Sequence, residues 1–480
     1  MSVTADSRDR RFALGATGLL RTFNQAEVLN AADVHVAQRL GRLLEEDDEL
    51  VLLATALAVR AVRAGSICLD LATVSELPLE HEEPLPWPDP ATWIETVGRS
   101  PLVRESMLRL VGSRLYLDRY WREEGQVCDD LVTRIRRTPP EVDQAALETG
   151  LLRVFPLDGY DEQRTAARAA AARWTTVLTG GPGTGKTTTV AGLLALVAEQ
   201  HELETGQPPR IALSAPTGKA AARLQEAVQE ATSKLTDPVD QQRLAGLRSS
   251  TLHRLLGWRP DSSVRFRHNR SNRLPHDVIV VDETSMVSLT MMARLLEAVR
   301  PDARLVLVGD PDQLASVEAG AVLADLVAGF EGSPDSPVHA LQTTHRFGRH
   351  IGALAQALRD GDADAVMSSL ASGSDEVELV DPTDETAMTG FRARVTDVAA
   401  ALRGAAERGD GPAALEALSR HRLLCAHREG PYGVGGWNRQ VERLVSERTG
   451  VTHYDEWYAG RPILVTANDY DQLLNNGDMG

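Results

Sequence analysis

The sequence predicts an α/β fold in which two parallel-sheet lobes follow a mainly helical N-terminal domain. Three observations lead to this fold class. A glycine-rich turn near residue 180 joins a β-branched strand to a helix, and two later apolar runs end in acidic residues near 282 and 310. The alternation of strands and helices then resumes after residue 345. Strands that alternate with helices in this way indicate parallel sheets covered by helices.

Length and charge limit the classes of protein to which the chain can belong. At 480 residues it is too long for a single core, so several domains are expected. The net charge of −17 argues against a protein that simply coats nucleic acid, because phosphate binding requires basic surface. Any DNA contact is therefore expected to be local, or shared with a basic partner.

Cysteine usage and hydropathy predict a cytoplasmic protein without a membrane span. Cys68, Cys128 and Cys425 lie far apart, which argues against a disulfide framework or a zinc site within the chain. The most apolar stretch, 51–62, is too short to cross a bilayer and contains an arginine. Residues 1–11 are polar and do not form an apolar signal region.

The N-terminal part carries no catalytic signature and is predicted to be an accessory domain. Apolar spacing predicts helices at 24–44 and 47–64, and alternation of polar and apolar residues predicts a strand at 113–121. The predicted organisation is a partner-docking domain at 1–110, a connecting segment at 111–158, a first lobe at 159–344 with a basic insertion at 259–275, and a second lobe at 345–480.

The glycine-rich turn has the composition of a phosphate-binding loop. A strand at 175–179 precedes it and a helix with amphipathic spacing at 188–197 follows it, which disfavours a chance glycine turn. Lys186 would reach the β- and γ-phosphates, and the Thr187 hydroxyl would ligate Mg²⁺. The chain has only three lysines among its 51 basic residues, and one of them lies here. We therefore expect a nucleoside triphosphate to bind Gly180, Gly181, Pro182, Gly183, Thr184, Gly185, Lys186, Thr187 and Thr188.

Upstream of this loop, Gln163 is a candidate reader of the adenine base, because its amide offers one donor and one acceptor. The alternative is an ordinary exposed glutamine at the start of a helix. The nearby phosphate-binding loop favours the adenine role.

A second strong site follows the apolar run 278–281, which is typical of a central strand buried on both faces. Asp282 would hold Mg²⁺, and Glu283 would orient and deprotonate the attacking water. The strand at 304–308 leads to Gln313, whose amide can hydrogen-bond the γ-phosphate. Arg346, where the second lobe begins, is a candidate arginine finger.

Three segments are candidates for DNA contact. Pro216, Thr217, Gly218 and Lys219 open a helix after the strand at 210–214, and Thr251 and His253 begin a similar segment. Their hydroxyls and helix N-termini could hold backbone phosphates, although simple helix capping is an equal alternative. In the basic insertion, Arg265 and Arg267 alternate with apolar residues, as in a β-hairpin arm with one charged face. A solvated loop is the alternative.

The second lobe is predicted to repeat the α/β alternation. Strands are expected at 376–380, 422–426 and 462–467, with helices at 389–408 and 437–448 between them.

Taken in order, these motifs resemble those of the RecD subunits of RecBCD helicase–nucleases, which are superfamily 1 DNA helicases. The resemblance covers the chain from about residue 21 to its last residue. It rests on GGPGTGKT at 180–187, SAPTGKAAARL at 214–224, TLHRLLG at 251–257, VVDETSMV at 280–287, LVGDPDQLASVEAG at 307–320, THRF at 344–347 and CAHREGPYGVGGWN at 425–438.

The resemblance implies two RecA-like lobes, 5′→3′ translocation on single-stranded DNA, and ATP and Mg²⁺ as fuel. It also implies a heterotrimer with RecB-like and RecC-like subunits that acts in double-strand break repair and recombination. The N-terminal domain would dock on the RecC-like subunit, and the nuclease site would lie in the RecB-like one. Members of the family continue beyond the position of Gly480 with two helicase segments and a second catalytic arginine, so the second lobe is expected to be incomplete.

Two other functions remain open on the sequence. One is an ATP-binding regulatory or structural subunit of the same kind of complex that does not translocate. The other is an RNA helicase of the same superfamily.

Overall fold

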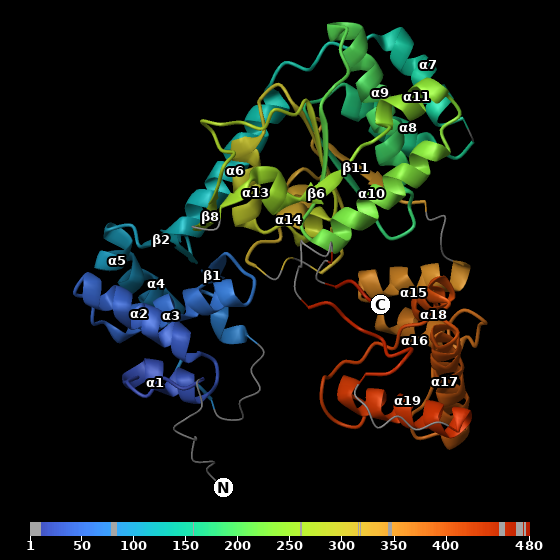
Figure 1. Cartoon of the computed structure of the whole chain (residues 1–480). Coiled ribbons are helices and arrows are strands. Elements are labelled where there is room, and N and C mark those ends of the chain that lie inside the picture. The colour runs from blue at the N-terminus through green and yellow to red at the C-terminus, as the bar shows by residue number, and fades with distance from the viewer. Residues whose placement is uncertain are drawn as a thin grey trace. The chain divides into compact units, whose positions relative to one another are not determined.

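The computed structural model describes residues 11–77, 84–156, 158–259, 262–314, 316, 318–343, 348–450, 457–466, 474 and 477–480, with residues 262–264 described by their backbone alone. The chain divides into two compact units, Met1–His345 and Arg346–Gly480 (Figure 1). Within the described ranges, no helix is both long and apolar enough to cross a membrane.

The first unit begins with a helical domain that carries a small antiparallel sheet. Its strands are ordered β1-β3-β2. Its elements are α1 (Gly18–Gln25), α2 (Ala31–Leu43), α3 (Glu49–Arg63), β1 (Cys68–Asp70), the 3-10 helix η1 (Val74–Glu76), α4 (Pro90–Arg99), α5 (Pro101–Arg104), β2 (Leu108–Val111) and β3 (Arg114–Leu117). Phe23, Leu53 and Trp93 lie in its core, each at most 1% exposed. The apolar positions at helical spacing therefore build a core that is separate from those of the large sheet.

Two sequence predictions for this domain need correction. The helix expected at 24–44 is two helices, because Asn24 is buried and its side chain binds the turn between them: its Nδ2 donates to the Leu29 carbonyl at 2.6 Å. Asn30 and Asp33 then form a capping box that starts α2. The strand expected at 113–121 ends at Leu117, because α6 (Asp118–Arg136) begins at the next residue.

Helix α6 fastens the N-terminal domain to the large sheet through one buried arginine. Arg134 is 7% exposed, and its guanidinium donates to the Thr175 hydroxyl at 3.0 Å and to the carbonyls of Arg300 at 2.8 Å, Trp174 at 2.9 Å and Ala303 at 2.5 Å. Burial, with neighbouring arginines, lowers the pKa of Arg134 to about 10. The charge is kept in the interior because its donors meet carbonyl and hydroxyl acceptors.

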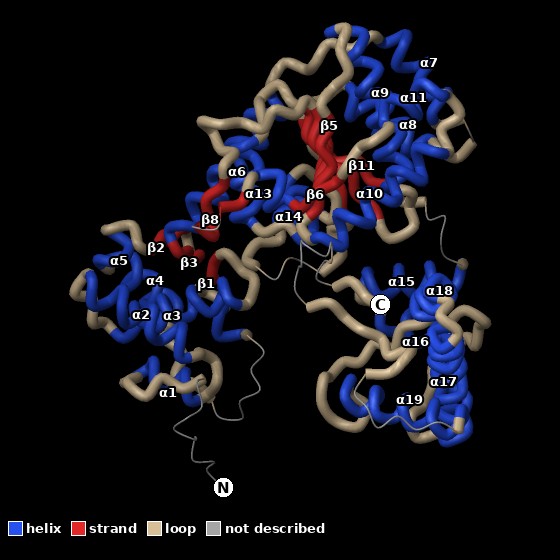
Figure 2. The backbone as a smooth tube through the Cα atoms, viewed as in Figure 1, coloured by secondary structure: helices blue, strands red, loops and turns tan. Residues whose placement is uncertain are grey.

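The large sheet has six strands in the order β11-β4-β10-β9-β5-β6, and every neighbouring pair is parallel. The strands are β4 (Thr175–Gly180), β5 (Ile211–Ala215), β6 (Ser249–Thr251), β9 (Val278–Val281), β10 (Arg304–Gly309) and β11 (Val338–Leu341). Figure 2 shows these strands in the interior of the unit with helices around them. The parallel-sheet α/β core that the sequence predicts is confirmed here.

Alternate residues of the central strands belong to different hydrophobic cores. In β9, Val278 and Val280 pack with the helices of one face, whereas Ile279 and Val281 pack with those of the other. The first face is covered by α7 (Gln144–Val154), α8 (Asp161–Ala171), α9 (Lys186–Thr205), α10 (Gly218–Ser233) and α11 (Pro238–Leu244), and the second by α6, α12 (Leu252–Leu256), α13 (Leu289–Ala298) and α14 (Val322–Gly329). This two-sided burial explains the continuous apolar runs of the central strands.

Helix α9, which follows the glycine-rich turn, is not amphipathic as expected. Every residue from Thr189 to Ala198 is buried. The helix lies against β4 and is packed by α7, α8, α10 and α11. Because neighbours surround it, an apolar residue is accommodated at each position of the helix.

The second unit contains helices α15 (Arg349–Asp360), α16 (Ala363–Ala371), α17 (Glu385–Glu407), α18 (Gly411–Arg420) and α19 (Val434–Thr449). The two expected helices are confirmed as α17 and α19, but the three expected strands are not strands in the described residues. Residues 376–380 are irregular, and the Glu376 carboxylate accepts from the His350 and Ile351 N–H groups at the start of α15. Residues 422–426 have no neighbouring strand in the described part. Around the antiparallel bridge between Leu464 and Met479, Ile463 and Gly480 exchange backbone hydrogen bonds at 2.7 and 3.1 Å, which makes a short pairing and not a strand of a larger sheet. A two-stranded pairing of this length, with no further strand beside it among the described residues, does not build a sheet.

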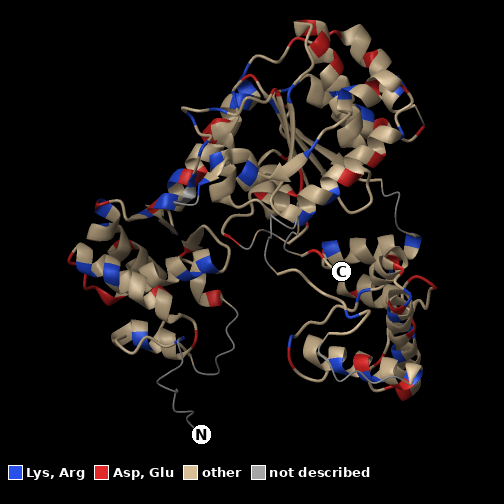
Figure 3. Cartoon of the chain, in the orientation of Figure 1, with Lys and Arg blue, Asp and Glu red and all other residues tan. Residues whose placement is uncertain are grey.

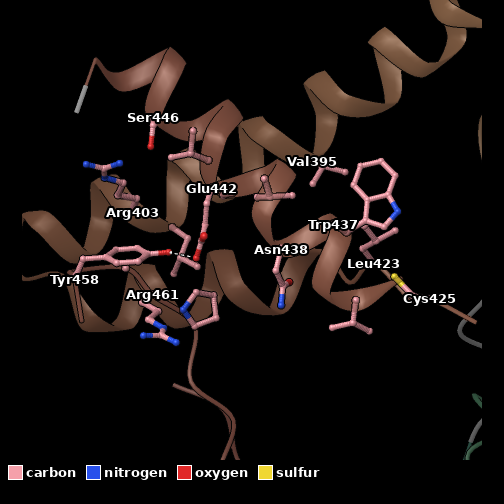
Figure 4. Close-up of a pocket in the computed structure, with 17 residues that line it drawn as sticks. Val395, Arg403, Leu423, Cys425, Trp437, Asn438, Glu442, Ser446, Tyr458 and Arg461 are labelled. Carbon is pink, nitrogen blue, oxygen red and sulfur yellow. Dashed lines mark hydrogen bonds between the residues drawn. The ribbon is translucent and has the colours of Figure 1, made fainter. Parts of the chain in front are cut away.

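A cavity of about 660 Å³ lies in this second unit. Its walls come from α17, α19 and residues 458–462, and Trp437 and Val395 contribute apolar surface (Figure 4). The Tyr458 hydroxyl donates to Glu442 at 3.3 Å within it. None of the described residues that line this cavity is a nucleotide or DNA candidate of the sequence.

Candidate functional site

The carboxyl edge of the large sheet gathers the residues that the sequence singled out. Because all six strands are parallel, the segments that follow them leave from the same edge. Strand β4 leads into the glycine-rich turn, β9 into Asp282 and Glu283, and β10 into Gln313. Strand β10 lies between β4 and β9, so these three exits are neighbours.

The glycine-rich turn depends on close backbone approach. Gly183 and Gly185 have φ values of 81° and 85°, in the left-handed region that favours glycine. A Cβ on Gly180 would lie 2.7 Å from the Leu341 carbonyl oxygen of β11, so no larger residue fits there without a backbone shift. Helix α9 begins directly after this turn, at Lys186. The backbone N–H groups of its first turn thus lie at the end of the loop.

The Lys186 side chain folds back against the glycine-rich turn. Its Nζ donates to the carbonyls of Gly180 at 2.5 Å and Gly181 at 3.0 Å. Thr184 also binds the loop, because its hydroxyl donates to the Gly181 carbonyl at 2.9 Å. Backbone carbonyl oxygens of the glycine-rich turn therefore hold the Lys186 ammonium group against the turn.

Asp282 lies close enough to Lys186 for the two charges to interact. Burial raises the pKa of Asp282 to about 6, and the charge of Glu283 adds to the rise, whereas the hydrogen bond from the Glu283 backbone N–H and the Lys186 ammonium oppose it. A carboxyl group whose pKa is raised by burial, beside a specific charged partner, is a candidate functional residue. Glu283 has a φ of 50°, a strained value for a residue with a Cβ, where the chain leaves β9 for the 3-10 helix η2 (Thr284–Met286).

Gln313 is tied to the segment that follows β9. The Ser285 hydroxyl donates to its amide oxygen at 3.2 Å. The two strand ends also approach at Gly309, where a Cβ would lie 3.2 Å from the amide nitrogens of Thr284 and Ser285. The Ser285 hydroxyl thus connects the segments that follow β9 and β10. The sequence patterns did not indicate a role for Ser285, which could have been suspected only from its position two residues after Glu283.

Gln163 is buried beside the phosphate loop, and its amide has no protein partner among the described residues. Gln163 is 1% exposed, and neither Oε1 nor Nε2 makes a hydrogen bond within the described ranges. A Cβ on Gly185 would lie 3.8 Å from its Nε2. The alternative of an exposed helix-start glutamine is therefore wrong. A buried amide without a partner is costly, and such groups are commonly found where a ligand or water completes the bonding.

The DNA candidates at Thr217 and Thr251 are helix caps in the structure. The Thr217 hydroxyl accepts from the Ala220 N–H at 3.2 Å, and that of Thr251 accepts from the Arg254 N–H at 3.3 Å. Pro216, Gly218 and Lys219 lie at the same start of α10. His253 lies in the first turn of α12, with its ring 5.7 Å from that of Phe266. The Thr217 and Thr251 hydroxyls are therefore used in capping. The backbone N–H groups at the helix N-termini are the groups that could contact phosphate.

The basic insertion contains the expected hairpin, formed by β7 (Trp258–Arg259) and β8 (Ser262–Phe266). Phe266 is buried in the core under the sheet, whereas Arg265 and Arg267 on either side are exposed. Two later arginines have structural roles instead: Arg270 pairs with Asp130 at 2.7 Å, and Arg273 donates to the Val299 carbonyl at 2.7 Å. Arg346, the candidate finger, lies outside the described residues.

Models of known protein families match parts of the chain. A family model described as an AAA domain matches residues 163–319, and the model of the N-terminal domain of RecBCD enzyme subunit RecD matches residues 25–116. The chain is 58% identical to RecBCD enzyme subunit RecD of Mycobacterium tuberculosis over 98% of this chain and 80% of that protein. The chain belongs to the RecD family. The RecD subunit of Mycolicibacterium smegmatis is also 58% identical, over 96% of this chain and 80% of that protein.

A more distant relative is the ATP-dependent RecD2 DNA helicase of Deinococcus radiodurans. It is 32% identical over 79% of this chain and 46% of that protein. The match with the AAA model begins at Gln163 and ends at Ala319, so it contains the glycine-rich turn, Asp282, Glu283 and Gln313. An AAA domain implies that the chain binds a nucleotide.

Proposed function

We propose that this RecD-family chain is the ATP-dependent 5′→3′ DNA helicase subunit of a RecBCD-type helicase–nuclease that acts in double-strand break repair and recombination. The observation that carries this proposal is the convergence of Lys186 and Asp282 at the edge of a parallel sheet, beside the Gln163 amide, which has no partner in the part of the chain that the structure describes. Such an arrangement suits a nucleoside triphosphate, because it offers a base reader, a phosphate loop and a cation ligand together.

The residues present fit ATP with Mg²⁺. The glycine-rich turn and the start of α9 would bind the phosphates, the Thr187 hydroxyl and Asp282 would hold Mg²⁺, and Gln163 would bind the adenine edge. Bound Mg²⁺ would supply positive charge to the β- and γ-phosphates. Once a nucleotide enters, we expect Lys186 to exchange the loop carbonyls for phosphate oxygens, which bind an ammonium more strongly.

Hydrolysis would rest on three further residues. Glu283 would accept the proton of the attacking water, and Gln313 would orient groups at the γ-phosphate from the neighbouring strand end. Arg346 would supply positive charge to the γ-phosphate. The hydrogen bond between Ser285 and Gln313 supports a shared site, because it joins the two strand ends that carry these groups.

The strand order supports a separate place for DNA on the same edge. The DNA candidates follow β5 and β6 at one end of the sheet, whereas the phosphate loop follows β4 near the other end. Strands β9 and β10 lie between them and carry Asp282, Glu283 and Gln313. The residues that we expect to act at the γ-phosphate thus lie between the predicted ATP site and the predicted DNA site. Such an arrangement suits an ATPase that DNA stimulates.

Partners would complete the enzyme. We infer that RecB-like and RecC-like subunits form a heterotrimer with this chain in the cytoplasm, with the nuclease site in the RecB-like subunit. The net charge of −17 supports shared DNA binding. Figure 3 shows acidic and basic residues interspersed over the helices of both units. DNA contact would therefore be local, at the hairpin and the helix N-termini.

DNA-stimulated ATP hydrolysis by the chain in complex with its RecB-like and RecC-like partners tests the proposal. Lys186→Ala should abolish the ATPase of this subunit, while Lys234→Ala is a matched control because Lys234 is an exposed lysine paired with Glu230 at 2.6 Å. The partner subunits should carry a silencing change in their own ATPase site. Single-stranded DNA should raise the rate, and RNA should not. A rate unaffected by DNA would instead support a regulatory ATP-binding subunit, and a normal rate with Lys186→Ala would refute the site.

A further inference from the structure

The first turn of α8 makes a second contact at the nucleotide site, through the residue before Gln163. The Glu162 carboxylate accepts hydrogen bonds from the Gln342 N–H at 2.9 Å, the Thr343 N–H at 3.2 Å and the Thr343 hydroxyl at 3.2 Å. One side chain therefore binds two consecutive backbone groups and a hydroxyl that are 180 residues and more away along the chain. Hydrogen bonds to an ionised acceptor are about twice as strong as neutral ones.

The segment that Glu162 binds continues directly from the strand beside the phosphate loop. Strand β11 ends at Leu341, whose register partner in β4 is Gly180, the first glycine of the loop. The contact is tight, since a Cβ on Gly180 would lie 2.7 Å from the Leu341 carbonyl oxygen. Two residues after Thr343, the chain passes from the first unit to the second, between His345 and Arg346. Residues 342–343 are thus the last described part of the first unit before the boundary.

Neighbouring residues of α8 therefore lie beside the end of the loop and beside the exit of the strand that pairs with its first glycine. Gln163 has its buried amide beside Gly185, and Glu162 binds the exit of β11 next to Gly180. A movement of the first turn of α8, as when the Gln163 amide gains a partner, would be transmitted to residues 342–343 through the Glu162 carboxylate.

We propose that Glu162 is a positioning residue that couples occupancy of the adenine site to the segment joining the two units. This inference rests on the proposed ATP site. Glu162 would hold residues 342–343 in the conformation that hydrolysis needs, without itself touching the nucleotide. Its loss should therefore lower kcat and leave ATP binding intact.

A general effect on the helix has to be separated from this coupling. Acidic residues in the first turn of a helix stabilise it through the helix dipole, and Asp161 shares that position with Glu162. Asp161 is exposed and pairs with Arg164 at 3.0 Å within its own helix. Asp161→Ala is therefore the matched control, because it removes a charge from the same turn.

The experiment measures nucleotide affinity and turnover separately in the assembled complex. A fluorescent ATP analogue gives Kd for Glu162→Ala, Glu162→Gln, Thr343→Val and Asp161→Ala, and steady-state assays with single-stranded DNA give kcat and KM. We expect Glu162→Ala to lower kcat about tenfold, the equivalent of about 1.4 kcal/mol, with Kd within about twofold of the wild type. Glu162→Gln keeps an acceptor oxygen and should recover part of the rate, and Asp161→Ala should retain it.

A double mutant tests whether Glu162 acts through its contact with Thr343. If Glu162 acts through Thr343, adding Thr343→Val to Glu162→Ala should lower kcat no further, although Thr343→Val alone lowers it. Unchanged kcat in Glu162→Ala, or a loss of affinity equal to the loss of rate, would overturn the coupling. An equal loss of rate in Asp161→Ala would overturn it as well. Failure of the wild-type chain to bind the analogue would instead refute the proposed ATP site.

Discussion

Replacing Gln163 with methionine is expected to stabilise the nucleotide-free protein and to weaken its binding of ATP. The two side chains have similar length and flexibility, so the loss of rotamer freedom on folding nearly cancels. The amide of Gln163 is 1% exposed and neither of its polar atoms has a protein partner among the described residues. An unsatisfied buried polar group costs about 1–3 kcal/mol, so its removal should raise the free energy of unfolding by about that amount.

The effect on ATP has the opposite sign. If the amide donates one hydrogen bond to the adenine and accepts another, methionine forfeits both, at about 0.5–1.5 kcal/mol each. Because each 1.4 kcal/mol is a factor of ten, Kd for ATP should rise by roughly tenfold, with less discrimination against GTP. Thermal unfolding of the nucleotide-free chain and titration calorimetry with ATP measure the two effects on the same samples.

Gln200 provides the matched control. It is 3% exposed, but its amide is satisfied, since it accepts from the Asp143 N–H at 2.8 Å and donates to the Asp143 carbonyl at 3.3 Å. Gln200→Met should therefore destabilise the protein and leave ATP affinity unchanged. The reasoning is refuted if Gln163→Met lowers the unfolding midpoint as Gln200→Met does, or if it binds ATP as tightly as the wild type.

Three further outcomes follow from the geometry. Glu283→Gln should abolish hydrolysis while ATP affinity measured by calorimetry stays within about threefold, because the amide keeps the shape but accepts no proton; a large loss of affinity would make Glu283 a binding residue. Neutralising Arg265 and Arg267 should weaken DNA binding and reduce the salt slope by about two, and an unchanged slope in anisotropy titrations would assign the hairpin to solvent. Arg134→Leu should lower the free energy of unfolding by about 3 kcal/mol or more, because several buried acceptors lose their donor; exposed Arg136→Leu is the control, and an equal effect of both in urea denaturation would contradict the buried role.

Local sequence patterns predicted the structure correctly where the pattern lies within one strand or one turn. The run at 278–281 is apolar at every position, and in the structure both faces of β9 are buried. The glycines at 183 and 185 were predicted as part of a phosphate loop, and both have positive φ. In the hairpin, the alternation of Arg265, Phe266 and Arg267 predicted one buried and two exposed side chains, which is confirmed.

Patterns failed where partners distant in the sequence decide the outcome. Residues 376–380 alternate like a strand, but Glu376 binds the start of α15 and the described residues offer no strand to pair with. Helix α9 was expected to have a polar face, yet helices that arrive later and earlier in the chain cover it on every side between Thr189 and Ala198.

The sequence by itself determined the parallel-sheet core and the glycine turn at its edge, because glycine turns and apolar strands carry their requirements within a few residues. Only the tertiary structure decided that the Gln163 amide is buried with no partner among the residues described, and that Glu162 binds residues 342–343. It also decided that Arg134 of α6 lies in the interior and binds carbonyls from two distant segments. Burial and long-range hydrogen bonds depend on which elements pack together, and that information is not contained in any single stretch of the chain.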